Sequence, residues 1–221
     1  MPIKAVLLDL DNTLYDYERC NSAALDSVMN RLSSIFGKPK EAVEEIFGQS
    51  RDAVKLWLED TASSHSRFLY FQKTIETLNQ TTNVQLTKEL HDHFWEVYFN
   101  QMKLSDGVLE FLEYLKNSGI KIAIVSDLTA ETQFKKLLNL GLDKYVDFVI
   151  TSEEAGMEKP SKEIFQLTLE KLGVSKNEVM FIGDNLEKDA QGAQNFGINF
   201  IHVSNGNFRN VIGSFKTLTS I

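Results

Sequence analysis

Polar side chains that could do chemistry follow four separate stretches of the sequence, each at the point where an apolar run or its loop ends. They are Asp9, Asp11 and Thr13, then Ser126 and Asp127, then Lys159, and finally Asp184, Asn185 and Asp189. Mg²⁺ prefers carboxylate oxygens and keeps water and phosphate oxygens in its other positions. A lysine and a hydroxyl suit the remaining oxygens of a phosphoryl group, whose charge they offset. If the fold brings these residues together, the set fits metal-assisted phosphoryl transfer.

The first of these stretches, VLLDLDNTLYD at residues 6–16, ends an apolar run with two acids, Asp9 and Asp11. Burying carboxylates at the end of an apolar strand costs several kcal/mol unless other groups compensate. A bound Mg²⁺ and a protonated Asp11 would relieve the repulsion between the two acids. Thr13 starts a sharp reversal of the chain, and we expect its hydroxyl to hydrogen-bond Asp9.

Short apolar runs alternate with amphipathic segments from residue 104 onward, which is the pattern of repeated strand and helix units. The predicted strands are residues 3–9, 120–126, 147–151, 178–183 and 199–203. Strands that are apolar throughout predict a parallel sheet with helices on both faces. The predicted fold class is therefore α/β, a Rossmann-like three-layer sandwich with a central parallel sheet. In such sheets ligands bind outside the carboxyl ends of the strands, where the polar residues above are placed.

Residues with helix-capping chemistry mark the limits of the helices between these strands. Asp106 and Ser161 are predicted to cap the starts of two helices, and Gly141 and Gly197 are predicted to end two others. An acid that follows a strand can itself be an N-cap, and this alternative stays open for Asp184.

Residues 16–103 interrupt the pattern with helical periodicity and little β character. A structureless loop of that length is uncommon inside a compact domain. We therefore expect a helical cap domain at residues 16–103, joined by hinges near Asp16 and Lys103 to an α/β core domain of residues 1–15 and 104–221. The helical stretches are AALDSVMNRLSSIF, EAVEEIFG, AVKLWLED, RFLYFQKTIETLN and LTKELHDHFWEVYFNQM.

The composition is that of a globular protein, with 43% hydrophobic and 24% charged residues, and its formal net charge is −8. This acidic balance argues against a nucleic-acid partner, because binding to phosphate backbones needs clustered lysines and arginines. The apolar stretch before Asp9 is too short for a secretory signal or a membrane span, and the single Cys20 cannot form an intrachain disulfide. We expect a cytoplasmic monomer or homodimer whose partner is a small phosphate ester, with no nucleic-acid or membrane partner.

Four stretches resemble the motifs of the haloacid dehalogenase superfamily of hydrolases: DLDNT, the strand end at Ser126, EKP with Lys159, and GDNLEKD. The resemblance covers residues 1–15 and about 104–205, in the expected order and on the expected elements. The helical insertion after the first motif resembles the subgroup with a helical cap. The resemblance implies an Mg²⁺-dependent phosphatase of small phosphorylated metabolites, such as sugar phosphates, nucleotides or phosphoglycolate.

The resemblance also implies a role for each residue of the set. Asp9 resembles the nucleophile that forms an aspartyl-phosphate, and Asp11 resembles the general acid and base. Asp184, with Asp9 and the backbone carbonyl of Asp11, resembles the metal-binding set. Asp189 would support that set by holding water or by orienting Lys159. The remaining implied roles are phosphate binding by Ser126 and Lys159 and support by Thr13, Asp127 and Asn185.

Asp127 departs from the family pattern, in which many members have asparagine at that place. Its negative charge should weaken anion binding unless it points away or pairs with a cation. Taken alone, Lys159 could also be a solvated loop lysine and Ser126 an ordinary turn serine. We favour the functional interpretation because four signals stand in order at the ends of predicted parallel strands.

Three other functions are compatible with the same fold. A phosphomutase would keep the core residues and use a sugar phosphate as acceptor instead of water. A 2-haloacid dehalogenase would use Asp9 on carbon, but it needs neither a metal nor an acid at the second position, so Asp11 and Asp184 argue against it. A catalytically idle binding protein is disfavoured because Asp9, Asp11, Lys159 and Asp184 are all present.

Overall fold

The computed structural model describes residues 2–59, 61–204 and 208–219. The chain forms two compact units. One is built from the residues up to Tyr17 together with those from Lys103 onward, and the other from Glu18–Met102. The strands of the described residues all belong to the first unit, whereas the second is helical.

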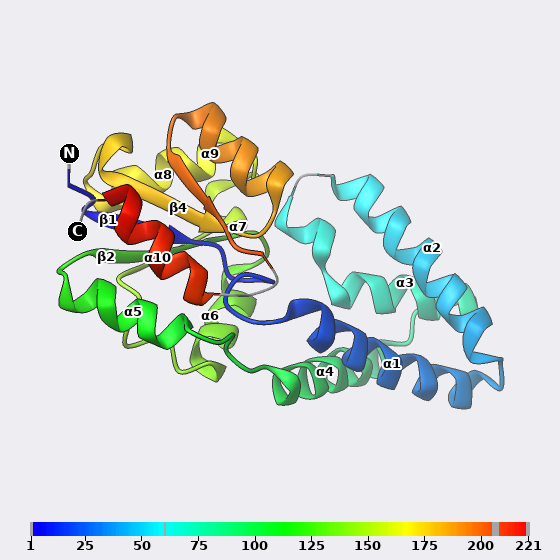
Figure 1. The fold of residues 1–221 in the computed structure, drawn as a ribbon. Helices are drawn as coiled ribbons and strands as arrows, with labels where there is room; N and C mark the ends of the chain where they lie inside the picture. Colours follow the sequence, from blue (N-terminus) through cyan, green and yellow to red (C-terminus); the bar gives the residue numbers. More distant parts are fainter. Residues whose placement is uncertain (1, 60, 205–207, 220–221) are drawn as a thin grey trace. The chain divides into compact units, whose positions relative to one another are not determined.

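A five-stranded parallel sheet in the order β3-β2-β1-β4-β5 forms the centre of the first unit (Figure 1). Its strands are β1 (Ala5–Leu8), β2 (Lys121–Ser126), β3 (Phe148–Thr151), β4 (Val179–Gly183) and β5 (Asn199–His202). Each begins and ends within two residues of the sequence prediction, and the predicted α/β fold class is confirmed. Leu8 of β1 lies beside Ile124 of β2 and Ile182 of β4. The carboxyl ends of these three strands therefore meet at one edge.

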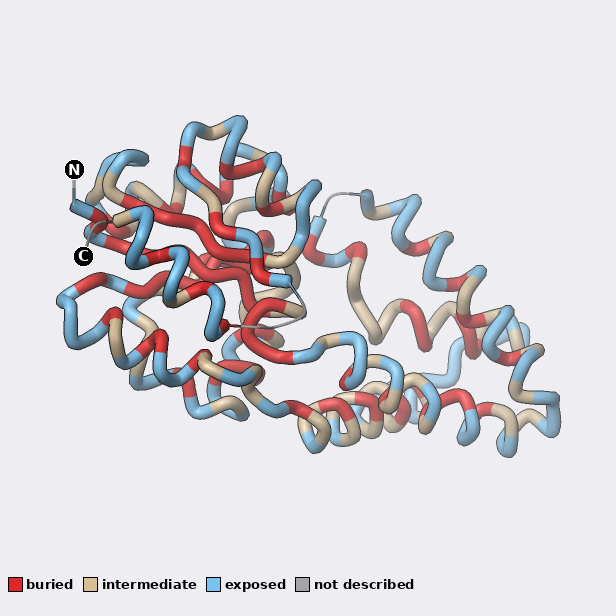
Figure 2. Tube along the Cα trace, viewed as in Figure 1, coloured by how far each residue is buried: buried red, intermediate tan, exposed pale blue. Residues whose placement is uncertain are grey.

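Helices cover both faces of this sheet, whose central strands are buried (Figure 2). On one face lie α8 (Lys162–Leu172) and α9 (Gln191–Phe196), and Phe165 packs against Phe181 with ring centroids 5.6 Å apart. On the other lie α5 (Val108–Asn117) and α10 (Phe208–Thr219), joined by aromatic contacts. Burying one such ring contributes roughly 1.5–3 kcal/mol. The remaining helical elements of the unit are α6 (Ala130–Asn139), α7 (Ser152–Ala155), the 3-10 turn η2 (Lys176–Glu178) and the π-helical turn η3 (Leu186–Ala190).

Of two predicted N-caps, one is wrong and the other is right in position but makes no capping hydrogen bond. The N-cap of α5 is Gly107 and not Asp106, because the chain turns there with a φ of 86°, which glycine adopts without strain. Ser161 does stand at the N-cap of α8, but its hydroxyl donates to the Glu163 carboxylate and caps no backbone N–H. The predicted end of α9 at Gly197 is confirmed, with a φ of 84° at its C-cap.

The second unit consists, in its described residues, of α1 (Tyr17–Phe36), α2 (Lys40–Leu58), the 3-10 turn η1 (Ala62–His65), α3 (Arg67–Asn79) and α4 (Val84–Gln101). Two stretches with predicted helical periodicity, EAVEEIFG and AVKLWLED, lie in the single helix α2 as far as Leu58. Glu59 is the C-cap of this helix, and Asp60 lies outside the described residues. The internal Gly48 is tolerated because glycine costs a helix only about 1 kcal/mol relative to alanine. No described helix combines the length and the apolar character needed to cross a bilayer. That this unit acts as a moving cap stays a prediction.

Candidate active site

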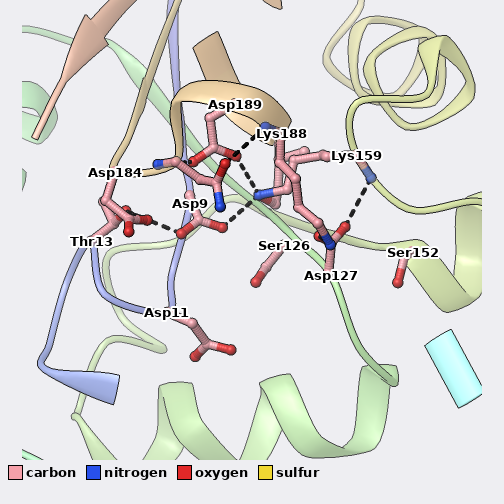
Figure 3. Close-up of polar contacts among 12 residues, drawn as sticks. Asp9, Asp11, Thr13, Ser126, Asp127, Ser152, Lys159, Asp184, Lys188 and Asp189 are labelled. Atoms are coloured by element: carbon pink, nitrogen blue, oxygen red, sulfur yellow. Dashed lines mark hydrogen bonds and ion pairs between the residues drawn. The ribbon is translucent and has the colours of Figure 1, made fainter. Parts of the chain in front are cut away.

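The residues predicted for the site gather at the carboxyl edge of the sheet (Figure 3). Asp9 directly follows β1, Ser126 ends β2, and Asp184 directly follows β4. The backbone N–H of Asp9 donates to the carbonyl of Ile182 at 3.0 Å, so the pairing of the sheet continues to this residue. The sheet itself therefore fixes the backbone from which the Asp9 side chain projects.

The Asp9 carboxylate is buried, and a different side chain holds each of its oxygens. Lys159 Nζ donates to Oδ1 at 2.6 Å, and the hydroxyl of Thr13 lies 3.0 Å from Oδ2. The hydrogen bond from Thr13 is the one that the sequence predicted. Burial raises the pKa of Asp9 to about 8, because the lysine offsets the loss of solvation only in part and the charge of Asp189 adds to it. A further cation at this point would favour the ionised form.

Lys159 is buried and not a solvated loop residue, since only 4% of it is exposed. Its ammonium group donates to Asp9 at 2.6 Å and to the carbonyl of Val125 at 3.1 Å, and it pairs with Asp189 at 2.8 Å. Burial alone would lower the pKa of Lys159, but the two carboxylates outweigh it and raise the pKa well above its usual value. Lys159 is therefore a fixed positive charge between two acids, as Figure 3 shows.

Three carboxylates form a cluster of possible metal ligands beside this lysine. Asp9, Asp184 and Asp189 each offer an oxygen, and these oxygens all lie within 4.8 Å of one another. Burial and the charge of Asp189 raise the pKa of Asp184. Three acids share one buried lysine, so the cluster has excess negative charge and oxygen donors only, which is the chemistry of a hard divalent cation site. The carboxylate of Asp11 does not belong to this cluster.

Asn185, and not Asp184, caps the turn that follows β4. The side-chain oxygen of Asn185 accepts the backbone N–H groups of Glu187 at 3.0 Å and Lys188 at 2.9 Å, at the start of η3. The backbone N–H of Asn185 in turn donates to Asp189 at 3.1 Å. Asp184 is thereby left to face the cluster, and the alternative that Asp184 is the N-cap is wrong.

Asp127 pairs with a cation and also orders the loop of Lys159. One carboxylate oxygen accepts the backbone N–H of Lys159 at 2.9 Å, and the other accepts from Lys188 Nζ at 2.9 Å. Lys188 also pairs with Glu158 at 2.8 Å. The extra charge at this position is thus compensated, which answers the concern that it would weaken anion binding. Its neighbour Ser126 accepts a hydrogen bond from Gln133 at 2.6 Å.

Asp11 lies apart from the carboxylate cluster and has a lysine of its own. Lys136 Nζ donates to both oxygens of Asp11, at 2.8 and 2.7 Å. The hydroxyl of Tyr15 donates to the same carboxylate. In Figure 3 the side chain of Asp11 points away from Asp9 and Lys159. The two acids of the first motif are therefore each neutralised by a different buried lysine.

Sequence reasoning missed Gln133 and Lys136 of α6 and Lys188 of η3. Two polar residues of α6, Gln133 and Lys136, are completely buried beside Leu137, whereas Phe134 and Leu138 are 52% and 63% exposed. A rule that turns every apolar residue toward the core would therefore place Lys136 in solvent and bury Phe134 and Leu138. The signal that was present is the spacing of three between Gln133 and Lys136, which puts both on one helix face.

Comparisons with known proteins agree on one family. A sequence model described as haloacid dehalogenase-like hydrolase matches residues 3–197. The chain is 39% identical to the ribulose-1,5-bisphosphate 5-phosphatase of Halopiger xanaduensis, over 88% of this chain and 82% of that protein. It is 27% identical to the glyceraldehyde 3-phosphate phosphatase of Methanopyrus kandleri, over 95% and 87% of the two chains. A solved HAD phosphatase from Thermococcus onnurineus is similar in structure, with a TM-score of 0.72, 27% identity and coverage of 93% and 88%.

Proposed function

Because this chain belongs to the haloacid dehalogenase-like hydrolase family, we propose that its site hydrolyses the phosphate monoesters of small sugars through a covalent intermediate on Asp9. The chain is a phosphoric monoester hydrolase by its similarity to named phosphatases. One observation carries the mechanistic proposal. Asp9 directly follows the central strand, where it is buried, held by Lys159 and Thr13, and grouped with two further carboxylates.

In the first step a carboxylate oxygen of Asp9 attacks phosphorus, and the bond between phosphorus and the sugar oxygen breaks. Asp11 gives its proton to the departing alkoxide, which leaves as the sugar alcohol. In the second step Asp11 takes a proton from water, and the water oxygen attacks the phosphorus of the aspartyl-phosphate. Inorganic phosphate leaves, and Asp9 is a carboxylate again. Covalent catalysis of this kind replaces one difficult displacement by two easier ones.

Lys159 and Ser126 are the proposed phosphate-binding groups. The ammonium group of Lys159 already contacts the nucleophile at 2.6 Å, so it lies where the incoming phosphoryl oxygens would gather. The Ser126 hydroxyl is fixed by Gln133 at 2.6 Å, so its orientation is set before substrate arrives. Thr13 holds the second oxygen of Asp9 and leaves the first beside Lys159.

We propose Mg²⁺ as the cation of the carboxylate cluster, held by Asp9 and Asp184 with the backbone carbonyl of Asp11. When bound, it supplies positive charge that offsets the charge of the phosphoryl oxygens. Asp189 is proposed to support the site by holding Lys159 at 2.8 Å and the backbone N–H of Asn185 at 3.1 Å. The all-oxygen donors and the excess negative charge support a hard divalent ion over a softer one.

The substrate class follows from the relatives that the chain resembles. The names of the two phosphatases described above refer to phosphate groups on short sugars, at carbon 5 of ribulose-1,5-bisphosphate and at carbon 3 of glyceraldehyde 3-phosphate. We propose a phosphorylated sugar of that kind, with its phosphate on a terminal carbon. The leaving group of such a substrate is an alkoxide, which departs poorly unless it is protonated. The proton that Asp11 supplies is therefore important for the first step.

Phosphate release from ribulose 1,5-bisphosphate and glyceraldehyde 3-phosphate, each measured with Mg²⁺ and with EDTA, tests this proposal. We expect activity that EDTA abolishes and that Asp9→Asn reduces by at least about 100-fold, whereas Asp143→Asn, at an exposed position, leaves it intact. Activity that survives both EDTA and Asp9→Asn would refute the mechanism. Transfer of phosphate to a second sugar, or halide release from 2-chloropropionate, would instead identify a mutase or a dehalogenase.

A further inference from the structure

We propose that Lys136 is a positioning residue for Asp11, which it holds in place for proton transfer at the active site. The inference rests on the proposed function, since it assumes that Asp11 moves protons during phosphate ester hydrolysis. Lys136 is not part of the four motifs that suggested that function. It enters through its contacts in the folded chain.

Three donated hydrogen bonds fix the Asp11 carboxylate. Lys136 reaches both oxygens, at 2.8 and 2.7 Å, and the Tyr15 hydroxyl donates to one of them. Tyr15 is itself completely buried, and the backbone around it is tied by bridges to Asp11 and Leu104. A carboxylate held at both oxygens cannot rotate freely about its side-chain torsions. Its orientation is thus set by the surrounding protein and not by solvent.

The ion pair between Lys136 and Asp11 requires a fully buried lysine on α6, which is energetically unfavourable. Lys136 has no exposed surface, and burying a lysine is strongly unfavourable unless a paired charge compensates. On the same helix Phe134 and Leu138 remain 52% and 63% exposed. A helix that served only to cover the sheet would bury those two side chains and expose the lysine. The buried side of α6 carries Leu137 together with the polar Gln133 and Lys136. The two buried polar residues are explained if this side of the helix holds polar groups of the site.

Gln133 supports the same interpretation of α6. It lies three residues before Lys136, on the same face of the helix, and its amide donates to Ser126 at 2.6 Å and to the carbonyl of Asp127 at 2.8 Å. One face of one helix therefore reaches both the acid of the first motif and the serine of the second. Movement of α6 would disturb both together.

Asp9 and Asp11 are only two residues apart, and a separate lysine compensates the charge of each. Asp9 pairs with Lys159 at 2.6 Å, and Asp11 pairs with Lys136. The two carboxylates therefore do not compete for one counter-charge. The Asp11 carboxylate pairs with Lys136 and does not belong to the group of possible metal ligands, so binding of a metal there would not engage it.

The leaving group provides a test that a merely structural role would not pass. A proton donor matters greatly when an alkoxide leaves and little when a stabilised phenolate leaves. For Lys136→Met we expect kcat/KM to fall roughly 100-fold with glyceraldehyde 3-phosphate and less than about 5-fold with 4-nitrophenyl phosphate. The matched control is Lys135→Met, the adjacent lysine, which is exposed and pairs only at the surface with Glu131. This control should leave kcat/KM unchanged for both substrates.

A double-mutant cycle with Asp11→Asn tests whether Lys136 acts through Asp11. If it does, Lys136→Met should cause less than about a 3-fold further loss in the Asp11→Asn background. Circular dichroism and thermal unfolding check that each variant folds. If Lys136→Met does not fold, Tyr15→Phe removes another donor to the same carboxylate and should show the same preference for the aryl substrate.

The outcomes separate this inference from the proposed function. An inactive wild-type enzyme, or an active Asp9→Asn variant, would overturn the proposed function. With those two results as expected, an equal loss on the alkyl and aryl substrates would overturn the role of Lys136. So would losses that simply multiply in the double variant.

Discussion

Replacing Lys159 by methionine is the strongest test of how the buried charges hold the site together. The change keeps much of the side-chain length but leaves Asp9 and Asp189 without the cation that lies 2.6 and 2.8 Å from them. Removing one partner of a buried ion pair costs about 3–5 kcal/mol, because the other charge stays buried without compensation. Lys159 is 4% exposed, so little of this cost is screened by water. We expect the free energy of unfolding to fall by about 3–5 kcal/mol.

Urea unfolding of the metal-free protein measures this loss, with Lys135→Met as the control. Lys135 pairs with Glu131, and both side chains are exposed, so its removal should cost about 0–1 kcal/mol. The two variants should therefore differ by about 3 kcal/mol, which is the difference between the two costs above. Equal midpoints for Lys159→Met and Lys135→Met would refute the idea that Lys159 is a buried counter-charge.

Four further predictions concern the carboxylate cluster. The pKa of Asp9 is raised from 3.8 to about 8, so between these pH values the native state keeps a proton on Asp9 that the unfolded state has lost. The free energy of unfolding of the metal-free protein should therefore fall as the pH rises from about 4 to about 8. For the same reason Mg²⁺ affinity should rise about tenfold per pH unit up to about pH 8, and calorimetry that finds no proton release at pH 7 would contradict this. Gly183→Ala would put its Cβ 2.3 Å from the Asp189 carboxylate, so we expect weaker Mg²⁺ binding and lower kcat; unchanged values of both would show that Asp189 has room to move. Thr13→Val removes the hydroxyl beside Asp9 and Asp184, at 3.0 and 3.2 Å, and should cost about 1–3 kcal/mol in urea unfolding, whereas a neutral result would deny these hydrogen bonds a role.

The sheet was predictable because its strands are continuous apolar runs with abrupt ends. Burial on both faces requires such runs, and β1 and β4 have no exposed residue. Helix starts were less predictable, because a cap depends on local backbone conformation and not on residue type alone. Gly107 takes over from Asp106 for that reason, and the joining of two predicted helical stretches into α2 shows that one glycine does not stop a helix.

The motif residues could be placed from sequence because the ends of parallel strands meet at one edge. Contacts that join distant segments could not. Lys188 and Asp127 are 61 residues apart, and Lys136 and Asp11 are 125 apart, so no local pattern links either pair. Lys136 also lies on the side of its helix that hydrophobic patterning would assign to solvent. Its partner becomes visible only when β1 and α6 are brought together by the fold.

Identification of the residue that carries phosphate during turnover tests the central claim most directly. The enzyme would be quenched with acid during hydrolysis of a sugar phosphate, treated with borohydride to reduce an acyl phosphate to homoserine, and digested for mass spectrometry. We predict conversion at Asp9 alone, dependent on substrate and absent from Asp9→Asn. Label at another residue, or full turnover with no phosphorylated aspartate under conditions that trap an acyl phosphate, would contradict the account.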